Sequence, residues 1–365
     1  MIKLIILDLK NYNSNELDKI LEYFKSLPDI SFCVSYLWLD NWITKNINRL
    51  DHLYLSLHSK DDVPIAFYPL YLKKIYFGYE LRFIGTGEAE TSEVSSEFQD
   101  FIINPLYISE SLELFTQQVK QLNRCVKISF EHVLPDSLCM QWLKSYKKFG
   151  WQLQEQLIGK RYRLDVLTSE QQQISQFPQT TLRRQARRFT DREDVQIVYC
   201  DEDSKIMDFF DNLIELHTLQ WQKRGKPGAF STQVFRQFHL DLSAALLKEN
   251  QLLLFELLVQ EKCIAVFYGF YHHDTLYYYQ SGISENSPLI NTGVAMHLIA
   301  MRHAREKQIK FYDLMAGKVN SYKAQYINSD TEVYSISYTT KWILVLSLFN
   351  KFMRRVQCLF SFKKG

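Results

Sequence analysis

The chain has 365 residues, which exceeds what one ordinary hydrophobic core organises and is about the length of two domains. Its hydrophobic fraction of 46% and charged fraction of 23% are those of a globular protein. The formal net charge of +2 excludes a global field that would attract nucleic acid or an acidic membrane, so electrostatic recognition must be local.

The cysteines and the first residues of the chain indicate in which cellular compartment the protein is expected. The six cysteines are scattered, without a C-x-x-C pair or a Cys/His ligand spacing, which argues against a disulfide framework and a zinc site. The start, MIKLIILDLK, has too short an apolar run for a signal peptide. No stretch approaches the roughly 18–20 apolar residues that span a bilayer. We therefore expect a cytoplasmic protein that binds no metal.

The first half alternates strands with helices. Apolar residues spaced by three and four predict helices over 16–27, 110–122 and 137–149. Runs rich in Tyr, Leu and Phe predict strands over 53–58, 64–72, 81–85, 100–103, 126–131 and 150–165. An acidic loop, 87–97, separates two of these strands, and the glutamine-rich segment 171–176 is interpreted as a polar joint. The first domain is therefore expected over residues 1–170.

The second half, expected to form a domain over 171–340, has the clearer pattern. Helices are predicted over 180–190, 203–222, 231–249, 293–307 and 318–327, and strands over 195–200, 251–260, 262–271, 275–283, 309–314 and 332–340. Three consecutive strands form an antiparallel meander, and a crossover helix leads to a strand that returns beside the third. Such a crossover is right-handed and leaves a crevice at the strand ends, where ligands bind. Because the two halves share this order, we expect an α/β chain with a duplicated fold.

The tail, residues 341–365, alternates apolar and basic side chains. The apolar ones include Trp342, Ile343, Leu344 and Phe352, and the basic ones include Lys351, Arg354, Arg355, Lys363 and Lys364. This composition suits a helix that lies at a membrane surface. It suits equally a last helix that packs on the body with a solvated basic face.

The stretch YYYQSGISENSPLINTGVAMHL has the pattern of an anion site. A strand ends near Gly282, a polar loop follows, and Asn291 or Thr292 can cap a helix that begins at Gly293. The first amides of that helix have no internal acceptor and lie at the positive end of its dipole. Gly293 and Ala295 are small enough for a pyrophosphate to approach the backbone. An ordinary capped helix explains the same residues.

A lone carboxylate, Asp313, lies inside an apolar predicted strand. A carboxylate in such a strand is expected to be paired with a hydrogen-bond donor or a cation, or to have a functional role. It can accept a proton from an acceptor amine or hydroxyl. It can also form a buried structural pair with Tyr322 or Lys323, and both interpretations stay open.

Two further groups are candidates for binding. The arginines 183, 184, 187 and 188 form one basic face of a helix, which suits nucleic acid, acidic lipid, a cofactor phosphate or solvent. His217 and Trp221 lie four residues apart on the next helix, just before a Gly/Pro loop. They can shape an acceptor pocket or pack in the core.

A series of short motifs follows in order along the second half: Leu182–Arg188, His217, Trp221, Arg224-Gly225, Phe238-His239, Tyr278-Tyr279-Gln280-Ser281-Gly282, Ser287-Pro288, Gly293, Asp313 and Tyr322-Lys323. In this order and spacing they resemble the CelD/FemAB-like GNAT acyltransferases, which are often described as cellulose- or exopolysaccharide-biosynthesis acetyltransferases. The similarity is densest over about 175–330. A weaker one in the first half involves Trp38, Trp42, the strands near 66–72 and 81–85, and the acidic loop up to Asp100-Phe101.

The resemblance implies two tandem GNAT-like domains, each a mixed, mostly antiparallel sheet flanked by helices, with the acyl donor in the second. It implies acetyl-CoA or another acyl-CoA as co-substrate, whose pyrophosphate meets the helix that begins at Gly293. The implied donor-binding residues are Ser281, Gly282, Asn291, Thr292, Gly293, Val294 and Ala295. The implied acceptor-binding residues are His217, Trp221, Arg224, Tyr279 and Gln280.

The chain departs from the family pattern at two places. The common GNAT motif Gln/Arg-x-x-Gly-x-Gly/Ala is replaced by a stretch with extra residues between Pro288 and Gly293. An acidic residue that the family often has after the strand aspartate is absent from Ala316-Gly317-Lys318. Asp313, Tyr322 and Lys323 therefore remain as the catalytic candidates.

We expect direct transfer of an acyl group to an amine or hydroxyl of a small molecule or saccharide. In this scheme Asp313, or a water that it holds, takes the proton and Tyr322 protonates the leaving thiolate. One alternative is an aminoacyl-tRNA-dependent FemAB-like transferase, the case in which a nucleic acid is expected. Another is a non-catalytic scaffold that docks on a membrane-bound polysaccharide assembly through residues 341–365.

Overall fold

The computed structural model describes residues 2–7, 12–27, 30–49, 52–89, 93–190, 194–327 and 330–341, and its thirteen strands form one sheet. The strand order is β1-β2-β3-β4-β6-β13-β7-β12-β11-β10-β9-β8, with β5 paired to β3. The strands are β1 (Ile2–Leu7), β2 (His52–Lys60), β3 (Val63–Ile75), β4 (Gly78–Phe83), β5 (Ile102–Ile103), β6 (Cys125–Val133), β7 (Trp151–Asp165), β8 (Val195–Tyr199), β9 (Leu252–Val259), β10 (Lys262–His272), β11 (Thr275–Ile283), β12 (Phe311–Gly317) and β13 (Thr331–Thr340). The helices are α1 (Ser14–Glu22), α2 (Tyr36–Asn46), α3 (Ile108–Gln121), α4 (Leu138–Ser145), α5 (Glu170–Gln176), α6 (Thr180–Thr190), α7 (Ile206–Gln222), α8 (Gln233–Lys248) and α9 (Thr292–Glu306).

The two halves of the chain follow the same plan. In the first half β1 to β4 form an antiparallel meander, and the chain crosses over through α3 to β6, which is parallel to β4. In the second half β8 to β11 form the meander, and α9 leads to β12, which is parallel to β11. A parallel pair requires a crossover of this kind. The predicted fold class, mixed and mostly antiparallel sheets flanked by helices, is confirmed.

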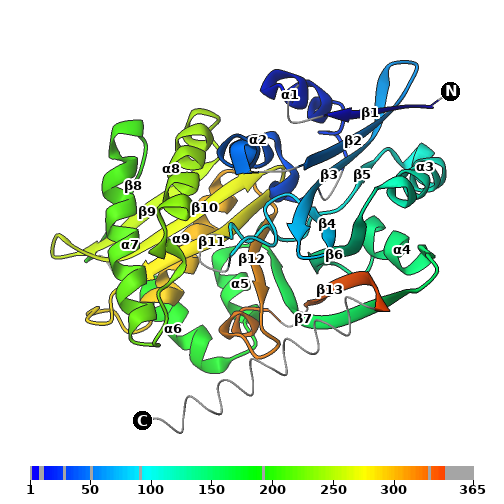
Figure 1. The fold of residues 1–365 in the computed structure, drawn as a ribbon. Coiled ribbons are helices and arrows are strands. Elements are labelled where there is room, and N and C mark those ends of the chain that lie inside the picture. The colour runs from blue at the N-terminus through cyan, green and yellow to red at the C-terminus, as the bar shows by residue number, and fades with distance from the viewer. Residues whose placement is uncertain are drawn as a thin grey trace, which may run out of the picture.

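The last strand of each half pairs with strands of the other half. β7 comes at the end of the first half, yet it lies beside β12. β13 comes at the end of the second half, yet it lies between β6 and β7. Figure 1 shows β13, in orange-red, beside the green strands β6 and β7. The predicted division into 1–170 and 171–340 stays a prediction, and the strand pairing crosses it.

A shared hydrophobic core also joins the halves. The first-half helix α2 packs against α8 of the second half (Figure 1). The fully buried Trp38 of α2 lies edge-on to Phe238 of α8, with ring centroids 5.1 Å apart. Phe32 stacks on Phe270 of β10 at 4.1 Å. Aromatic rings carry a large apolar surface, so burying these pairs stabilises the contact between the halves.

The segment predicted as a polar joint is instead the helix α5. Its polar residues are held by arginines of α9: Arg302 donates to both carboxylate oxygens of Glu170, at 3.0 and 3.1 Å, and Arg305 donates to Gln173 at 2.7 Å. Ile174 and Gln173 are buried in the process. The glutamine-rich composition concealed this helix because its partners lie more than 120 residues away in the sequence.

Two other predictions concern the end of the chain. The helix predicted over 318–327 is reduced to one 3₁₀ turn, Tyr322–Gln325. The predicted tail helix falls almost entirely on residues 342–365, which lie outside the described residues. Among the helices that are described, none combines the length and the apolar character needed to cross a bilayer.

The exchange of β7 and β13 predicts that the first half does not fold by itself. A fragment of residues 1–176 lacks β13, so β6 and β7 lose the strand that lies between them. We expect this fragment to unfold without a cooperative transition in urea, as followed by circular dichroism. Co-expression with residues 177–365 should restore a cooperative transition. A sharp transition of the isolated fragment would contradict the prediction.

Candidate active site

The two central strands of the second half separate part-way along their length. β11 and β12 pair from Thr275 with Phe311 to Tyr277 with Asp313, and no further. Beyond that point β11 has one extra residue, Tyr279, in its pairing with β10. β12 has one extra residue, just after Asp313, in its pairing with β7. Because such a bulge bends a strand and interrupts its ladder, the two strands diverge and leave a gap.

A buried ion pair holds the bulge of β12. One carboxylate oxygen of the fully buried Asp313 accepts from Nε and Nη2 of Arg161 in β7, each at 2.6 Å. The other oxygen accepts from the amide of Met315 at 2.7 Å. Met315 has a φ of 62°, a left-handed conformation that is unfavourable for a residue with a side chain. These contacts show that Asp313 stabilises the turn that opens the gap, while its predicted catalytic role stays a prediction.

Removing the guanidinium should therefore cost stability. The Arg161→Met variant leaves a buried carboxylate without its cation, and we expect the free energy of unfolding to fall by about 3–5 kcal/mol. Adding Asp313→Asn should recover part of this loss, because asparagine is neutral and its carbonyl can still accept from Met315. Urea unfolding of both variants measures the difference. A loss below about 1 kcal/mol in Arg161→Met would show that the pair is not needed.

A cavity of about 250 Å³ lies at the gap between β11 and β12. The second half lines it with Ala229, Phe235, Tyr279, Gln280, Met315, Ala316 and Lys323, and the first half with Glu93, Ser95 and Glu97. Three of these, Tyr279, Gln280 and Lys323, are residues that the sequence predicted. The acidic residues were not predicted as part of a site. They come from the acidic loop of the first half, which lies over the second half.

The backbone of Ala316 connects the two sides of this cavity. Its amide lies beyond the last residue of β12 that pairs with β11 and donates to the carboxylate of Glu97 at 2.7 Å. Its carbonyl accepts from the ammonium group of Lys323 at 2.6 Å. Burial lowers the pKa of Lys323 below its ordinary value. A lysine held in this way can donate a hydrogen bond into the cavity, and it gives up its proton more easily than an exposed lysine.

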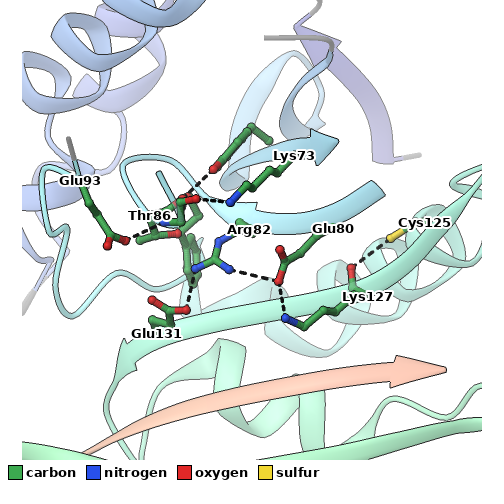
Figure 2. Close-up of polar contacts among 11 residues, drawn as sticks. Lys73, Glu80, Arg82, Thr86, Glu93, Cys125, Lys127 and Glu131 are labelled. Carbon is green, nitrogen blue, oxygen red and sulfur yellow. Dashed lines mark hydrogen bonds and ion pairs between the residues drawn. The ribbon is translucent and has the colours of Figure 1, made fainter. Parts of the chain in front are cut away.

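The acidic loop is fixed at both ends of its path. At the first end, Lys73 donates to the carbonyl of Gly87 and the amide of Gly87 donates to Glu93 at 2.7 Å; Figure 2 labels Lys73 and Glu93 there. In the second half, the hydroxyl of Tyr279 donates to the carbonyl of Val94 at 2.8 Å. The loop is therefore held against β11 by the same residue that forms the bulge.

The corresponding position of the first half is filled by charged side chains. There β4 and β6 correspond to β11 and β12, and Arg82 forms ion pairs with Glu80 at 3.1 Å and with Glu131 at 2.7 Å (Figure 2). Lys127 adds a second cation to Glu80 at 2.7 Å. A Cβ atom on Gly87 would lie only 2.2 Å from Nε of Arg82. The buried Arg82 side chain thus fills the space beside Gly87.

The start of α9 offers free backbone amides. Asn291 occupies the capping position with a φ of 66°, but its side chain makes no capping hydrogen bond. The hydroxyl of Thr292 instead bonds to Ser287 at 2.6 Å. Within the described part of the chain the amides of Thr292 and Gly293 have no acceptor, whereas that of Val294 donates to Asn291. A Cβ atom on Gly293 would meet only a methyl group of Ile283, at 3.4 Å, so little side-chain bulk lies beside this residue, whereas Thr292 is buried.

Four other residues predicted for the donor site have packing roles. A Cβ atom on Gly282 would lie 2.7 Å from Leu216, so this glycine lets α7 approach β11 closely. The hydroxyl of Ser281 bonds to Tyr278 at 2.7 Å. Val294 and Ala295 are buried in the core beneath α9. Their role as donor ligands stays a prediction.

A buried histidine lies beside the predicted residue Tyr322. The Nδ1 atom of His297 lies 2.6 Å from the hydroxyl of Tyr312, and its ring is stacked 6.2 Å from that of Tyr322. Burial lowers the pKa of His297 to about 3, so the ring is neutral near pH 7. Tyr322 itself is 51% exposed and lies outside the residues that line the cavity. No signal in the sequence distinguished His297 from an ordinary helix residue.

The predicted acceptor residues on α7 lie in two different environments. His217 is 1% exposed, and neither of its ring nitrogens has a hydrogen-bond partner in the described structure. Trp221 is partly exposed and has two cations over its ring, the guanidinium of Arg224 at 5.3 Å and the ammonium of Lys226 at 5.7 Å. His217 and Trp221 are in contact, with ring centroids 5.9 Å apart. His217, Trp221, Arg224 and Lys226 are all absent from the lining of the cavity at the gap.

His217 should make stability depend on pH. Burial lowers its pKa from 6.5 to about 4, so the unfolded chain binds a proton that the folded chain does not between these values. Stability from this residue is complete above pH 6.5 and falls by up to about 1.4 kcal/mol per pH unit below it. Urea unfolding of the wild type and of His217→Leu from pH 7.5 to 4.5 should show a shallower decline for the variant. Parallel curves would contradict this assignment.

A larger cavity of about 640 Å³ lies beside Arg161, which lines it. It is lined by residues of both halves, among them Ile30, Leu134, Arg163 and Phe311. It contains none of the residues that the sequence predicted for donor, acceptor or catalysis. The smaller cavity at the diverging strands is therefore the candidate active site.

Comparisons with known proteins concern the family and the fold of the chain. Residues 178–324, which include α6 to α9 and β8 to β12, match the family model described as "Acetyltransferase (GNAT) domain". This segment is therefore similar to a GNAT acetyltransferase domain. No curated protein matches the chain.

Solved structures extend the similarity of fold over nearly the whole chain. The crystal structure of FemX has a TM-score of 0.64 and 11% identity, and the match covers 94% of this chain and 98% of that chain. The C-terminal domain (DUF2156) of a putative lysylphosphatidylglycerol synthetase from Agrobacterium fabrum has a TM-score of 0.55 and 12% identity, covering 92% and 96% of the two chains. L-PGS from Bacillus licheniformis has a TM-score of 0.54 and 11% identity, covering 90% and 92%. At these identities the similarity concerns the fold.

Proposed function

We propose that the chain is an acyltransferase that takes its acyl group from an acyl-CoA thioester bound between β11 and β12. The observation that carries the proposal is the divergence of these strands beyond Tyr277 and Asp313, together with the free amides at the start of α9, the helix that connects them. The amides of Thr292 and Gly293 would hold the pyrophosphate of the donor. The matched GNAT domain model supports this use of the site.

The residues around the gap suit transfer from an activated thioester. Because a thioester needs little further activation, positioning supplies most of the rate. The bulge at Tyr279 frees backbone groups of β11, and one of its amides can donate to the carbonyl oxygen as negative charge develops there. Lys323 donates at the cavity wall opposite, where it can stabilise the same charge or the departing thiolate. Asp313 acts through the shape of the gap, because both of its oxygens are engaged.

The acceptor is an amine or a hydroxyl group that enters the cavity between the two halves. The carboxylates of Glu93 and Glu97 lie on this side and can orient the acceptor and remove its proton, directly or through a water. The resemblance to CelD/FemAB-like enzymes supports a sugar or a polysaccharide precursor as the molecule that carries this group. Acetyl-CoA is the first donor to test.

Titration with acetyl-CoA, and with its longer-chain analogues, tests the donor site. The wild type should bind in isothermal calorimetry. Gly293→Glu places a carboxylate where the pyrophosphate would lie, and we expect affinity to fall at least about a hundredfold. Gly293→Ala is the matched control, because its methyl group meets only a flexible side chain at 3.4 Å. Equal binding by the glutamate variant would refute the placement of the site.

One observation favours aminoacyl-tRNA as an alternative donor. The helix α6 packs against α9, and three of its arginines, Arg184, Arg187 and Arg188, are exposed. The fold is also similar to that of FemX, whose name places it with the Fem proteins. If tRNA is the donor, its binding should weaken steeply with salt, and Arg184→Glu should weaken it further. Acetyl-CoA binding without tRNA binding would exclude this alternative.

A further inference from the structure

Four chain segments meet at one end of the first-half sheet. The β3–β4 hairpin ends with the pair Ile75 and Gly78, and the next residue of β4 donates its amide to the carbonyl of Arg124, just before β6, at 2.8 Å. At the same end β13 finishes opposite the start of β7, where the amide of Lys341 donates to Gly150 at 3.2 Å. The hairpin tip, the α3–β6 turn, the α4–β7 turn and the end of β13 are therefore neighbours.

These segments are strongly basic. Residues 73–78, 120–124, 144–150 and 341 contain no Asp or Glu. Their cationic residues are Lys73, Lys74, Lys120, Arg124, Lys144, Lys147, Lys148 and Lys341. Lys74, Arg124, Lys147 and Lys341 are exposed and form no ion pair with any described residue. In a chain with a net charge of only +2, this end carries a local positive field.

Three aromatic side chains project from the same turns. Tyr76 is 92% exposed and Phe77 50% exposed at the hairpin tip, and Phe149 is 105% exposed in the α4–β7 turn. The rings of Tyr76 and Phe77 contact each other edge-on, with centroids 4.6 Å apart. Leaving such rings in water is unfavourable. Aromatic residues on protruding turns that are surrounded by lysine are typical of surfaces that contact a second phase.

The described part of the chain also ends at this edge. Lys341 is the last described residue, and the sequence that follows begins with Trp342, Ile343 and Leu344 and continues with alternating apolar and basic residues. The tail sequence is thus of the same chemical kind as the turns beside which it starts. Basic residues with large apolar neighbours are the composition of segments that lie at an anionic membrane surface.

We propose that this end of the molecule, the basic aromatic edge formed by residues 73–78, 120–124, 144–150 and 341, docks on the surface of an anionic lipid bilayer. The lysines and Arg124 pair with lipid phosphates, and Tyr76, Phe77 and Phe149 enter the headgroup region. The rings stand at the tips of convex turns, which suits insertion between headgroups. A single-stranded nucleic acid would instead require rings along a groove on which bases stack.

The edge lies on the side to which the candidate active site opens. Along β7, Gly317 at the open end of β12 is opposite Lys160, and Thr340 is opposite Trp151. The gap therefore opens toward the end of β7 at which the basic aromatic edge lies. The two are about 30 Å apart if β7 is fully extended between them. Docking at the edge would turn the mouth of the site toward the lipid surface, at a distance of about 30 Å.

Co-sedimentation of the full-length protein with vesicles tests the proposal. We expect it to bind vesicles of phosphatidylcholine with about 30% phosphatidylglycerol, and not phosphatidylcholine alone, with binding that weakens as salt is added. Lys74→Gln/Lys147→Gln should reduce partitioning about thirtyfold. Tyr76→Ser/Phe149→Ser should reduce it by a similar factor at constant charge.

A matched control removes two exposed lysines far from this edge. Lys248→Gln/Lys262→Gln has the same change of net charge and should bind vesicles as the wild type does. Thermal unfolding verifies that all variants are folded. The proposal is overturned if the edge variants bind as the control does, or if the wild type does not bind the anionic vesicles, whether or not it binds tRNA through the same residues. These outcomes leave the donor site untouched, because acetyl-CoA binding is measured separately.

Discussion

The shape of the candidate active site depends on the buried ion pair between Asp313 and Arg161. A charge so deep in a sheet is stable only when it is paired and hydrogen-bonded. Arg161 supplies the pairing from β7, and the amide of Met315 supplies the remaining hydrogen bond. This bonding keeps Met315 in its left-handed conformation and turns β12 away from β11. One residue of the first half therefore keeps open the gap that lies in the second half.

The same topology serves two different purposes in the two halves. In the second half, the bulges leave a cavity at the diverging strands. In the first half, Arg82 fills the corresponding position and Glu80, Lys127 and Glu131 balance its charge. Contacts next to this charged cluster also fix the acidic loop that covers the cavity (Figure 2). The first half thus acts as a positioning element for the second.

The sequence predicted most elements because their periodicity is local. The meander, the crossover helix α9 and the position of β12 all follow from short patterns in the second half. It could not predict that β7 and β13 change places, since strand pairing between distant segments leaves no local pattern. For the same reason it missed Arg161 and Glu97, whose partners lie 152 and 219 residues away. It did single out Lys323, because a lysine beside a tyrosine after the aspartate strand belongs to a family motif.

The exchange of strands also has a consequence for biosynthesis and evolution. On the ribosome, β6 and β7 emerge long before residues 331–340, so the first half must wait for the end of the chain before its sheet is complete. During that interval it exposes strand edges that can pair wrongly, which makes it a candidate client for chaperones. Over longer times the arrangement prevents either half from being lost or recombined as an independent module. The two halves, which share one plan, are therefore expected to be inherited together.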